Sequence, residues 1–198
     1  LFILNAEQDP KKFGNRAHKE ALWRALISVN ALEGIRFYVS FACSWAFVEQ
    51  KKLMEGNAKI IKLIARDENL HLASTQHILK NLVLEDDDFA EIARDCDADG
   101  TTESIFRMAA EQEKAWADYL FKDGSMVGLN AQMLKDYVEW LTNKRFKSVC
   151  NSIGSTGTKT IFPEANAKNP LPWTERWISG QDVQVAAQEA ALSSYTTG

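Results

Sequence analysis

The chain contains two long helix-forming segments, and acidic residues interrupt the apolar pattern of both. The first segment runs from about His18 to Gln50. Its apolar residues recur at the three- and four-residue spacing that places side chains on one face of a helix; they are Leu22, Leu26, Val29, Phe37 and Phe41. Glu33 falls within this series, one turn from Val29 and one turn from Phe37. Because an unpaired carboxylate in a core costs several kcal/mol or becomes neutral, we expect Glu33 to have a partner or a metal.

The second segment, from Asn57 to Val83, shows the same interruption. Its apolar series consists of Ile60, Ile64, Ile78 and Leu82. Between Ile64 and Ile78 the series passes through Glu68, His71 and Thr75 instead. Two neighbouring helices are therefore expected to offer acids to a shared interior, and one of them adds an imidazole.

A Glu on one helix and Glu-x-x-His on another form half of the ligand set of a di-iron or di-manganese carboxylate bundle. Glu68 and His71 are three residues apart and share a helix face, and carboxylates with imidazole suit iron or manganese. Two alternatives remain open at this point. An isolated Glu-x-x-His pattern is common on helix surfaces, and Glu33 could instead pair with an arginine such as Arg36 or Arg66.

Bulk properties exclude several classes of function. The 198 residues carry a net charge of −4 and no long basic run, so we expect no nucleic-acid binding. The longest nearly apolar run, Phe37 to Val48, is too short to span a bilayer, so no membrane association is predicted. The three cysteines are far apart and form no Cys-x-x-Cys pair, which indicates a reduced, cytoplasmic protein.

The pattern divides the chain into a helical portion, residues 1–150, and a portion comprising a loop, a short helix and a flexible C-terminal tail, residues 151–198. Helix breaks are predicted near Gly56 and Asn57, at Gly100 and at Gly124. The stretch "WTERWIS" within the second portion predicts the short helix. No strong strand pattern occurs in the sequence.

Four stretches resemble one known family: "VNALEGIRFYVSFACS", "LMEGNAKIIKLIARDENLHLASTQH", "EQEKAWADYLFKDGSMVGLN" and "VQVAAQE…SSY". The family is the small, radical-generating (beta) subunit of class I ribonucleotide reductase, and the resemblance runs from about Ser28 to the end. It implies an all-α, ferritin-like di-iron helical bundle. It also implies a role in reducing ribonucleotides to deoxyribonucleotides.

The resemblance assigns metal ligands by position. Glu33 resembles a carboxylate ligand of the second iron, Glu68 the bridging carboxylate, and His71 the imidazole ligand of that same iron. Iron is the implied metal, with manganese possible.

The resemblance also implies roles for residues around the metal. Phe37, Phe41 and Ile64 resemble the apolar pocket that shields the radical from water. Asp67 resembles the acid that links the metal site to a tryptophan in the electron path. In the tail, Tyr195 resembles the tyrosine that relays the radical to the large subunit, and Glu189 the acid tied to that transfer.

The family's other ligands come from two earlier helices, which the sequence does not show. We therefore expect a partial bundle, its C-terminal half, that is inactive alone. The implied partners are a complementary N-terminal portion of the small subunit, a second small subunit in a homodimer, and the large (alpha) subunit. Two alternatives remain: another ferritin-like di-metal carboxylate oxidase, or a non-catalytic truncated or split half-subunit.

Overall fold

The structure is a computed structural model that describes residues 15–155 and 160–179. Its elements are α3 (Asn15–Ala31), the π-helical segment η1 (Leu32–Arg36), α4 (Tyr38–Lys51), α5 (Glu55–Glu85), α6 (Asp87–Ala98), α7 (Thr101–Leu120), α8 (Ala131–Ser152) and α9 (Thr174–Ile178). Apart from an isolated bridge between Met126 and Leu129, these residues contain no β-structure. The described part of the chain is therefore all-α, as predicted.

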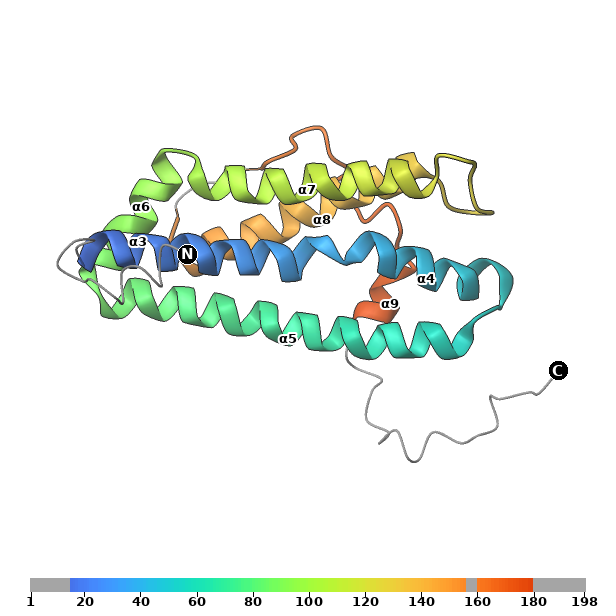
Figure 1. Cartoon of the computed structure of the whole chain (residues 1–198), viewed down its shortest axis with the longest axis horizontal. Coiled ribbons are helices and arrows are strands. Elements are labelled where there is room, and N and C mark those ends of the chain that lie inside the picture. Colours follow the sequence, from blue (N-terminus) through green and yellow to red (C-terminus); the bar gives the residue numbers. More distant parts are fainter. Residues whose placement is uncertain (1–14, 156–159, 180–198) are drawn as a thin grey trace, which may run out of the picture.

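The long helices lie side by side in a bundle (Figure 1). The run α3–η1–α4 and the single helix α5 lie next to each other and run in opposite directions. Helix α6 turns the chain at one end of the bundle, and α7 and α8 then pack against each other and against the first run. The short helix α9 contacts α4 and α5, and lies in the stretch where a short helix was predicted.

Local sequence explains most helix boundaries. The Asp86 side chain caps α6 by accepting a hydrogen bond from the amide of Asp88 at 2.9 Å, and Asn130 caps α8 in the same way. Gly100 separates α6 from α7 with φ of 78°, a conformation that favours glycine. The predicted break at Gly56 and Asn57 was misplaced, because α5 already begins at Glu55 and both residues lie in its first turn.

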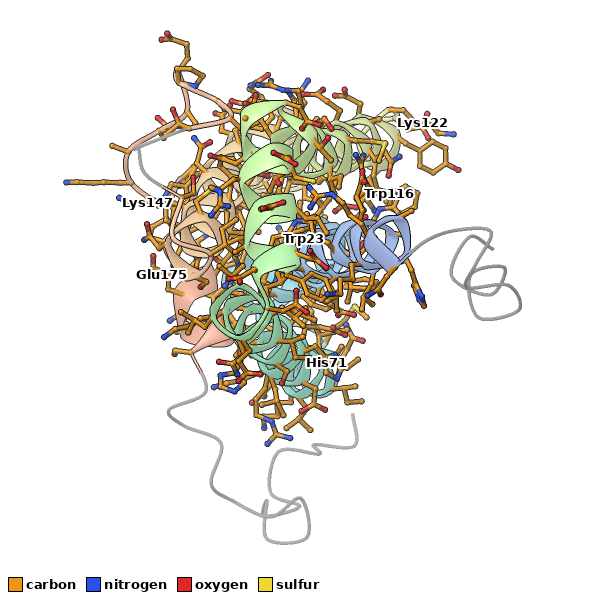
Figure 2. The ribbon with its side chains drawn as sticks, turned by 90° about the vertical axis from the view of Figure 1, so that its left-hand side faces the viewer. Trp23, His71, Trp116, Lys122, Lys147 and Glu175 are labelled. Carbon is orange, nitrogen blue, oxygen red and sulfur yellow. The ribbon has the colours of Figure 1, made fainter. Side chains whose placement is uncertain are left out.

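Large side chains of the α3–η1–α4 run fill the core. Trp23, Ile27, Tyr38 and Trp45 are almost or completely inaccessible to solvent, and each fully buried side chain of this size contributes about 2–3 kcal/mol. Figure 2 shows Trp23 in the middle of the bundle and His71 toward its edge. The core therefore fixes the helix that carries Glu33 without enclosing His71.

Most large residues of the predicted apolar faces do not pack within the part of the chain that the structure describes. Six residues of the two series that flank Glu33, Glu68 and His71 are more than a third exposed: Leu22, Val29, Phe37, Ile60, Ile64 and Ile78. The buried face of α5 instead contains Ala58, Ala65, Leu72 and Leu79. Both helices are apolar on two faces, and periodicity alone cannot tell which face packs within the chain. The predicted interior position of these residues was wrong for the part that the structure describes.

The helical run Asn15–Lys51 is long and apolar enough to cross a membrane by length and composition alone. Half of its most apolar window is buried inside the bundle. Trp23 and Trp45, near its two ends, are fully buried against other helices. This burial is what a core helix of a bundle requires.

Candidate metal centre

Glu33 lies in a short π-helical segment between two α-helices. The segment, Leu32–Arg36, widens the helix by one residue per turn, and such insertions are frequent at functional sites. Helix α7 contacts the far side of this segment, where Arg36 donates a hydrogen bond to Gln112. The Trp116 indole N–H donates to Ser40 Oγ at 3.0 Å just beyond the segment. Contacts with α7 therefore hold the segment that carries Glu33 in place.

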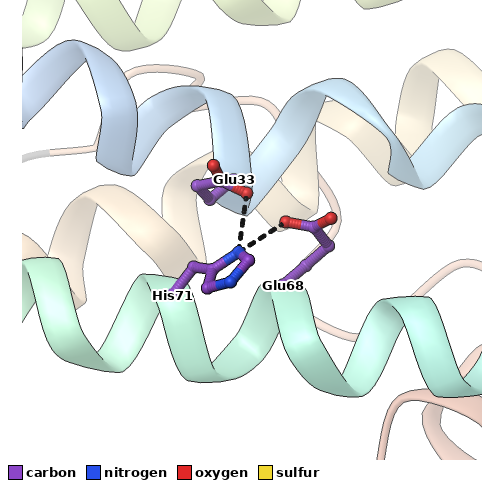
Figure 3. A group of neighbouring side chains, drawn as sticks. All are labelled: Glu33, Glu68 and His71. Atoms are coloured by element: carbon purple, nitrogen blue, oxygen red, sulfur yellow. Dashed lines mark hydrogen bonds and ion pairs between the residues drawn. The ribbon is translucent and has the colours of Figure 1, made fainter.

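The structure brings Glu33, Glu68 and His71 together, as Figure 3 shows. His71 Nδ1 lies 3.3 Å from Glu68 Oε2 and 3.6 Å from Glu33 Oε2. One donor atom from each residue lies within 4.8 Å of the other two. A single ion at ordinary metal–ligand distances of about 2.0–2.2 Å could reach all three after small side-chain adjustments.

Electrostatics within this cluster favour a cation. A hydrogen bond with Glu68 raises the pKa of Glu33, and burial and the negative charge of Glu68 raise it further. The hydrogen bond to Glu68 also raises the pKa of His71, although the His71 side chain is 57% exposed. Two carboxylates that compete for one imidazole proton form a site that a metal ion would neutralise.

The alternative in which an arginine neutralises Glu33 receives no support. Arg36 donates its hydrogen bond to Gln112, and Arg66 pairs with its neighbour Asp67 at 3.2 Å. The largest influences on the pKa of Glu33 come from Glu68, burial and His71, not from either arginine. The donor set that remains, two carboxylates and one imidazole, fits iron or manganese. Three protein ligands are too few to complete two metal coordination spheres.

The other residues predicted around the metal lie at different depths. Phe41 is buried and its ring stacks near that of Phe37, with 6.1 Å between centroids. Phe37 and Ile64 are 43% and 39% exposed, so the described residues do not form a closed apolar pocket. Asp67 is exposed and pairs with Arg66, outside the metal-ligand cluster. Glu189 and Tyr195 lie outside the described residues.

Sequence reasoning missed a partly buried polar network beside the cluster. Arg145 on α8 donates hydrogen bonds of 3.0 Å to the Tyr38 hydroxyl and to Asn69 Oδ1. Its guanidinium also lies over the Tyr38 ring, 5.4 Å from the centroid. Asn69 directly follows Glu68, so this network ties the ligand-bearing turn of α5 to α4 and α8. No local pattern could have revealed it, because the partners lie far apart in sequence.

A second missed residue is Glu113 on α7, which is only 7% exposed. Burial raises its pKa to about 7, while a hydrogen bond from the Val39 amide and the charge of Arg36 oppose the shift. Its Oε2 atom is buried and has no hydrogen-bond partner among the residues that the structure describes. The carboxyl group therefore supports the first turn of α4, next to the π-helical segment. The "EQEK" sequence around it resembles an ordinary exposed helix face.

Comparison with known proteins is consistent with this site. The family model described as "Ribonucleotide reductase, small chain" matches residues 3–170. The "Ribonucleoside-diphosphate reductase subunit beta" of Haemophilus influenzae is 54% identical over 92% of this chain and 46% of its own length. The protein of the same name from enterobacteria phage T4 is 40% identical over 98% of this chain and 48% of its own length. The chain thus spans about half the length of these curated relatives.

A solved structure shares the fold. The crystal structure of a putative class I ribonucleotide reductase from Bacillus halodurans matches with a TM-score of 0.66 and 24% sequence identity. The match covers 89% of this chain and 57% of the other. At this identity the likeness establishes the architecture alone, an all-α ferritin-like bundle.

Proposed function

The chain belongs to the small-chain family of ribonucleotide reductase, and we propose that it supplies part of the di-metal and radical site of a ribonucleoside-diphosphate reductase. The observation that carries the proposal is the convergence of Glu33, Glu68 and His71 from two helices onto one point. The complete assembly would be an oxidoreductase that converts ribonucleotides to deoxyribonucleotides.

Three side chains would hold the metal. Glu33 would bind one ion, Glu68 would bridge two, and His71 would bind the same ion as Glu33. Iron is the metal we propose, and the same donors suit manganese. When bound, the metal pair supplies the oxidising power that the protein's side chains lack. Phe37, Phe41 and Ile64 would keep water away from the site, and Asp67 would take part in proton-coupled electron transfer.

The exposed apolar residues near the cluster support the binding of a further helical segment there. Phe37 and Ile64 flank the ligand cluster on different helices, and both are more than a third exposed. Large exposed apolar side chains around a cluster whose imidazole is 57% exposed indicate a surface that is covered when the site is complete. We propose that a complementary N-terminal portion of a small subunit covers this surface and contributes the remaining carboxylate and imidazole ligands.

Further partners follow from the family. The proposed assembly contains a second small subunit and a large (alpha) subunit. Tyr195 in the tail would relay the radical to the large subunit, and the acid Glu189 would assist that transfer. A second candidate function remains, a non-catalytic half-subunit, and it is favoured because the described residues supply only three donors to the cluster. Family membership argues against an unrelated di-metal oxidase.

The test is reconstitution. The chain would be combined with the part of the Haemophilus influenzae relative that the alignment leaves uncovered, together with a large subunit, ferrous iron and dioxygen. We expect a tyrosyl radical signal by electron paramagnetic resonance and reduction of a ribonucleoside diphosphate. The matched control is the Glu68→Ala chain, which should associate equally well and yield neither. Association without radical or reduction by the unmodified chain would favour the non-catalytic alternative.

A further inference from the structure

Asn30 is completely buried on α3, one turn before Glu33. Its Nδ2 atom donates to Thr75 Oγ1 at 2.7 Å and lies 3.3 Å from the carbonyl oxygen of Leu72. Thr75 lies one turn after His71 on α5, and its hydroxyl lies 3.1 Å from the His71 carbonyl oxygen. A polar contact therefore joins the two ligand-bearing helices one turn away from the ligands.

This contact carries a cost that packing alone does not explain. The Oδ1 atom of Asn30 is buried and has no hydrogen-bond partner within the described part of the chain. A leucine of similar size would fill the position without leaving a polar atom unsatisfied. In helical interfaces, the best-attested use of a costly buried asparagine is to select one alignment of the helices over others.

We propose that Asn30 and Thr75 are positioning residues that fix the register of α3 relative to α5, and so place Glu33 opposite Glu68 and His71. The inference rests on the proposed metal site and adds to it residues that never touch the metal. Its physical basis is the steep dependence of ligand geometry on register. Sliding one helix by a single turn displaces its side chains by about 5.4 Å, whereas a functional constellation tolerates about 0.5 Å.

The close approach of the helices at Gly34 is consistent with this alignment. A Cβ atom at Gly34 would lie 3.2 Å from Leu72 Cδ1 and 3.3 Å from Arg145 Cγ. The α-carbon of Gly34 therefore faces the Leu72 side chain directly, beside the ligand cluster. The distance between Gly34 and Leu72 therefore reports the register of the two helices, and it can be measured without metal.

The test compares Thr75→Val with Thr75→Ser in the full chain. Valine keeps the shape of threonine but loses the hydroxyl, whereas serine keeps the hydroxyl. The matched control is Thr142→Val on α8, because Thr142 is also buried but lies outside the metal-ligand cluster. Two quantities are measured for each variant: the dissociation constant for Co²⁺ from its visible absorption, and the nuclear Overhauser effect between the Gly34 α-protons and the Leu72 methyl groups.

We expect Thr75→Val to weaken Co²⁺ binding by about 10- to 100-fold, the range found for residues that orient metal ligands, and to weaken the Gly34–Leu72 signal. Thr75→Ser should preserve both. An unchanged Gly34–Leu72 signal in Thr75→Val would overturn the proposal, and so would an equal loss of Co²⁺ affinity in Thr142→Val. If no form of the chain binds Co²⁺ but Thr75→Val alone loses the signal, the register role stands and the proposed metal site fails.

Discussion

The Oε2 atom of Glu33, on the π-helical segment, lies 3.6 Å from Nδ1 of His71 on α5. The same nitrogen lies 3.3 Å from the carboxylate of Glu68. The negative charge of the two carboxylates beside this imidazole is balanced either by protonation of the imidazole or by a bound metal ion. This relationship makes the role of the cluster open to direct tests.

The first prediction concerns removal of the ligands. Glu68→Ala or His71→Ala should abolish metal binding and leave the free energy of unfolding nearly unchanged, within about 0.5 kcal/mol, because neither side chain belongs to the packed core. Thermal unfolding and metal titration of the same samples measure both quantities. If the residues instead served as structural ion-pair partners, their removal would cost roughly 3–5 kcal/mol. A large loss of stability with metal binding retained would therefore contradict the assignment.

The second prediction concerns pH and Glu113. The pKa of this carboxyl group is about 7 in the folded chain, above the ordinary value of 4.5 for glutamate. A raised folded-state pKa gives stability that is fully present below the unfolded-state value and is lost as pH rises through the folded-state value. Relative to Glu113→Gln, the unmodified chain should therefore lose up to roughly 3 kcal/mol of unfolding free energy between pH 4.5 and pH 8.

Urea unfolding at several pH values measures this difference. Glu111→Gln is the matched control, because Glu111 is an exposed carboxylate on the same helix that pairs with Lys114. Its pH profile should follow that of the unmodified chain. Parallel profiles for Glu113→Gln and the unmodified chain would show that Glu113 does not titrate as described.

The third prediction concerns the partly buried network at Tyr38. Tyr38→Phe removes the hydroxyl that accepts a hydrogen bond from Arg145 and donates to Asn69 at 3.3 Å. Because the charged donor loses a buried partner, the change should cost about 1–3 kcal/mol of unfolding free energy. Tyr119→Phe, which changes a tyrosine with 58% exposure, should cost almost nothing. Equal melting temperatures for the two variants would show that the network does not stabilise the folded chain.

The sequence predicted that Glu33, Glu68 and His71 come together because the signals for this grouping are local. Glu68 and His71 share a face by spacing, and Glu33 stands out against the apolar residues one turn on either side of it. Gly100 likewise predicted the break between α6 and α7 through its backbone freedom. The register contact between Asn30 and Thr75 depends on how two helices meet, and no local pattern encodes it.

The choice of packing face could not be predicted for a related reason. Ile64 and Ala65 are adjacent and both apolar, yet Ala65 is buried and Ile64 is 39% exposed. Small residues allow helices to approach closely, so α5 turns its alanines toward its neighbours. The π-helical segment around Glu33 also lacks a sequence signature, because it is stabilised by contacts from α7.

The fourth prediction concerns Tyr195, in the tail outside the described residues. Tyr195→Phe keeps the ring and removes the phenol O–H on which proton-coupled oxidation depends. In the reconstituted complex, nucleotide reduction should collapse, while metal loading, the stored radical and binding to the large subunit persist. Turnover close to that of the unmodified complex would exclude Tyr195 from the radical path.

The central claim, that Glu33, Glu68 and His71 form part of a di-metal site completed by another helical segment, is tested most directly by iron stoichiometry. Iron would be measured after equilibrium dialysis for the chain alone and for the chain combined with the complementary portion of a small subunit. The account predicts weak, substoichiometric iron in the chain alone and about two irons per reconstituted unit, as expected for a di-iron carboxylate site. Two tightly held irons in the chain alone, or none in the reconstituted unit, would contradict it.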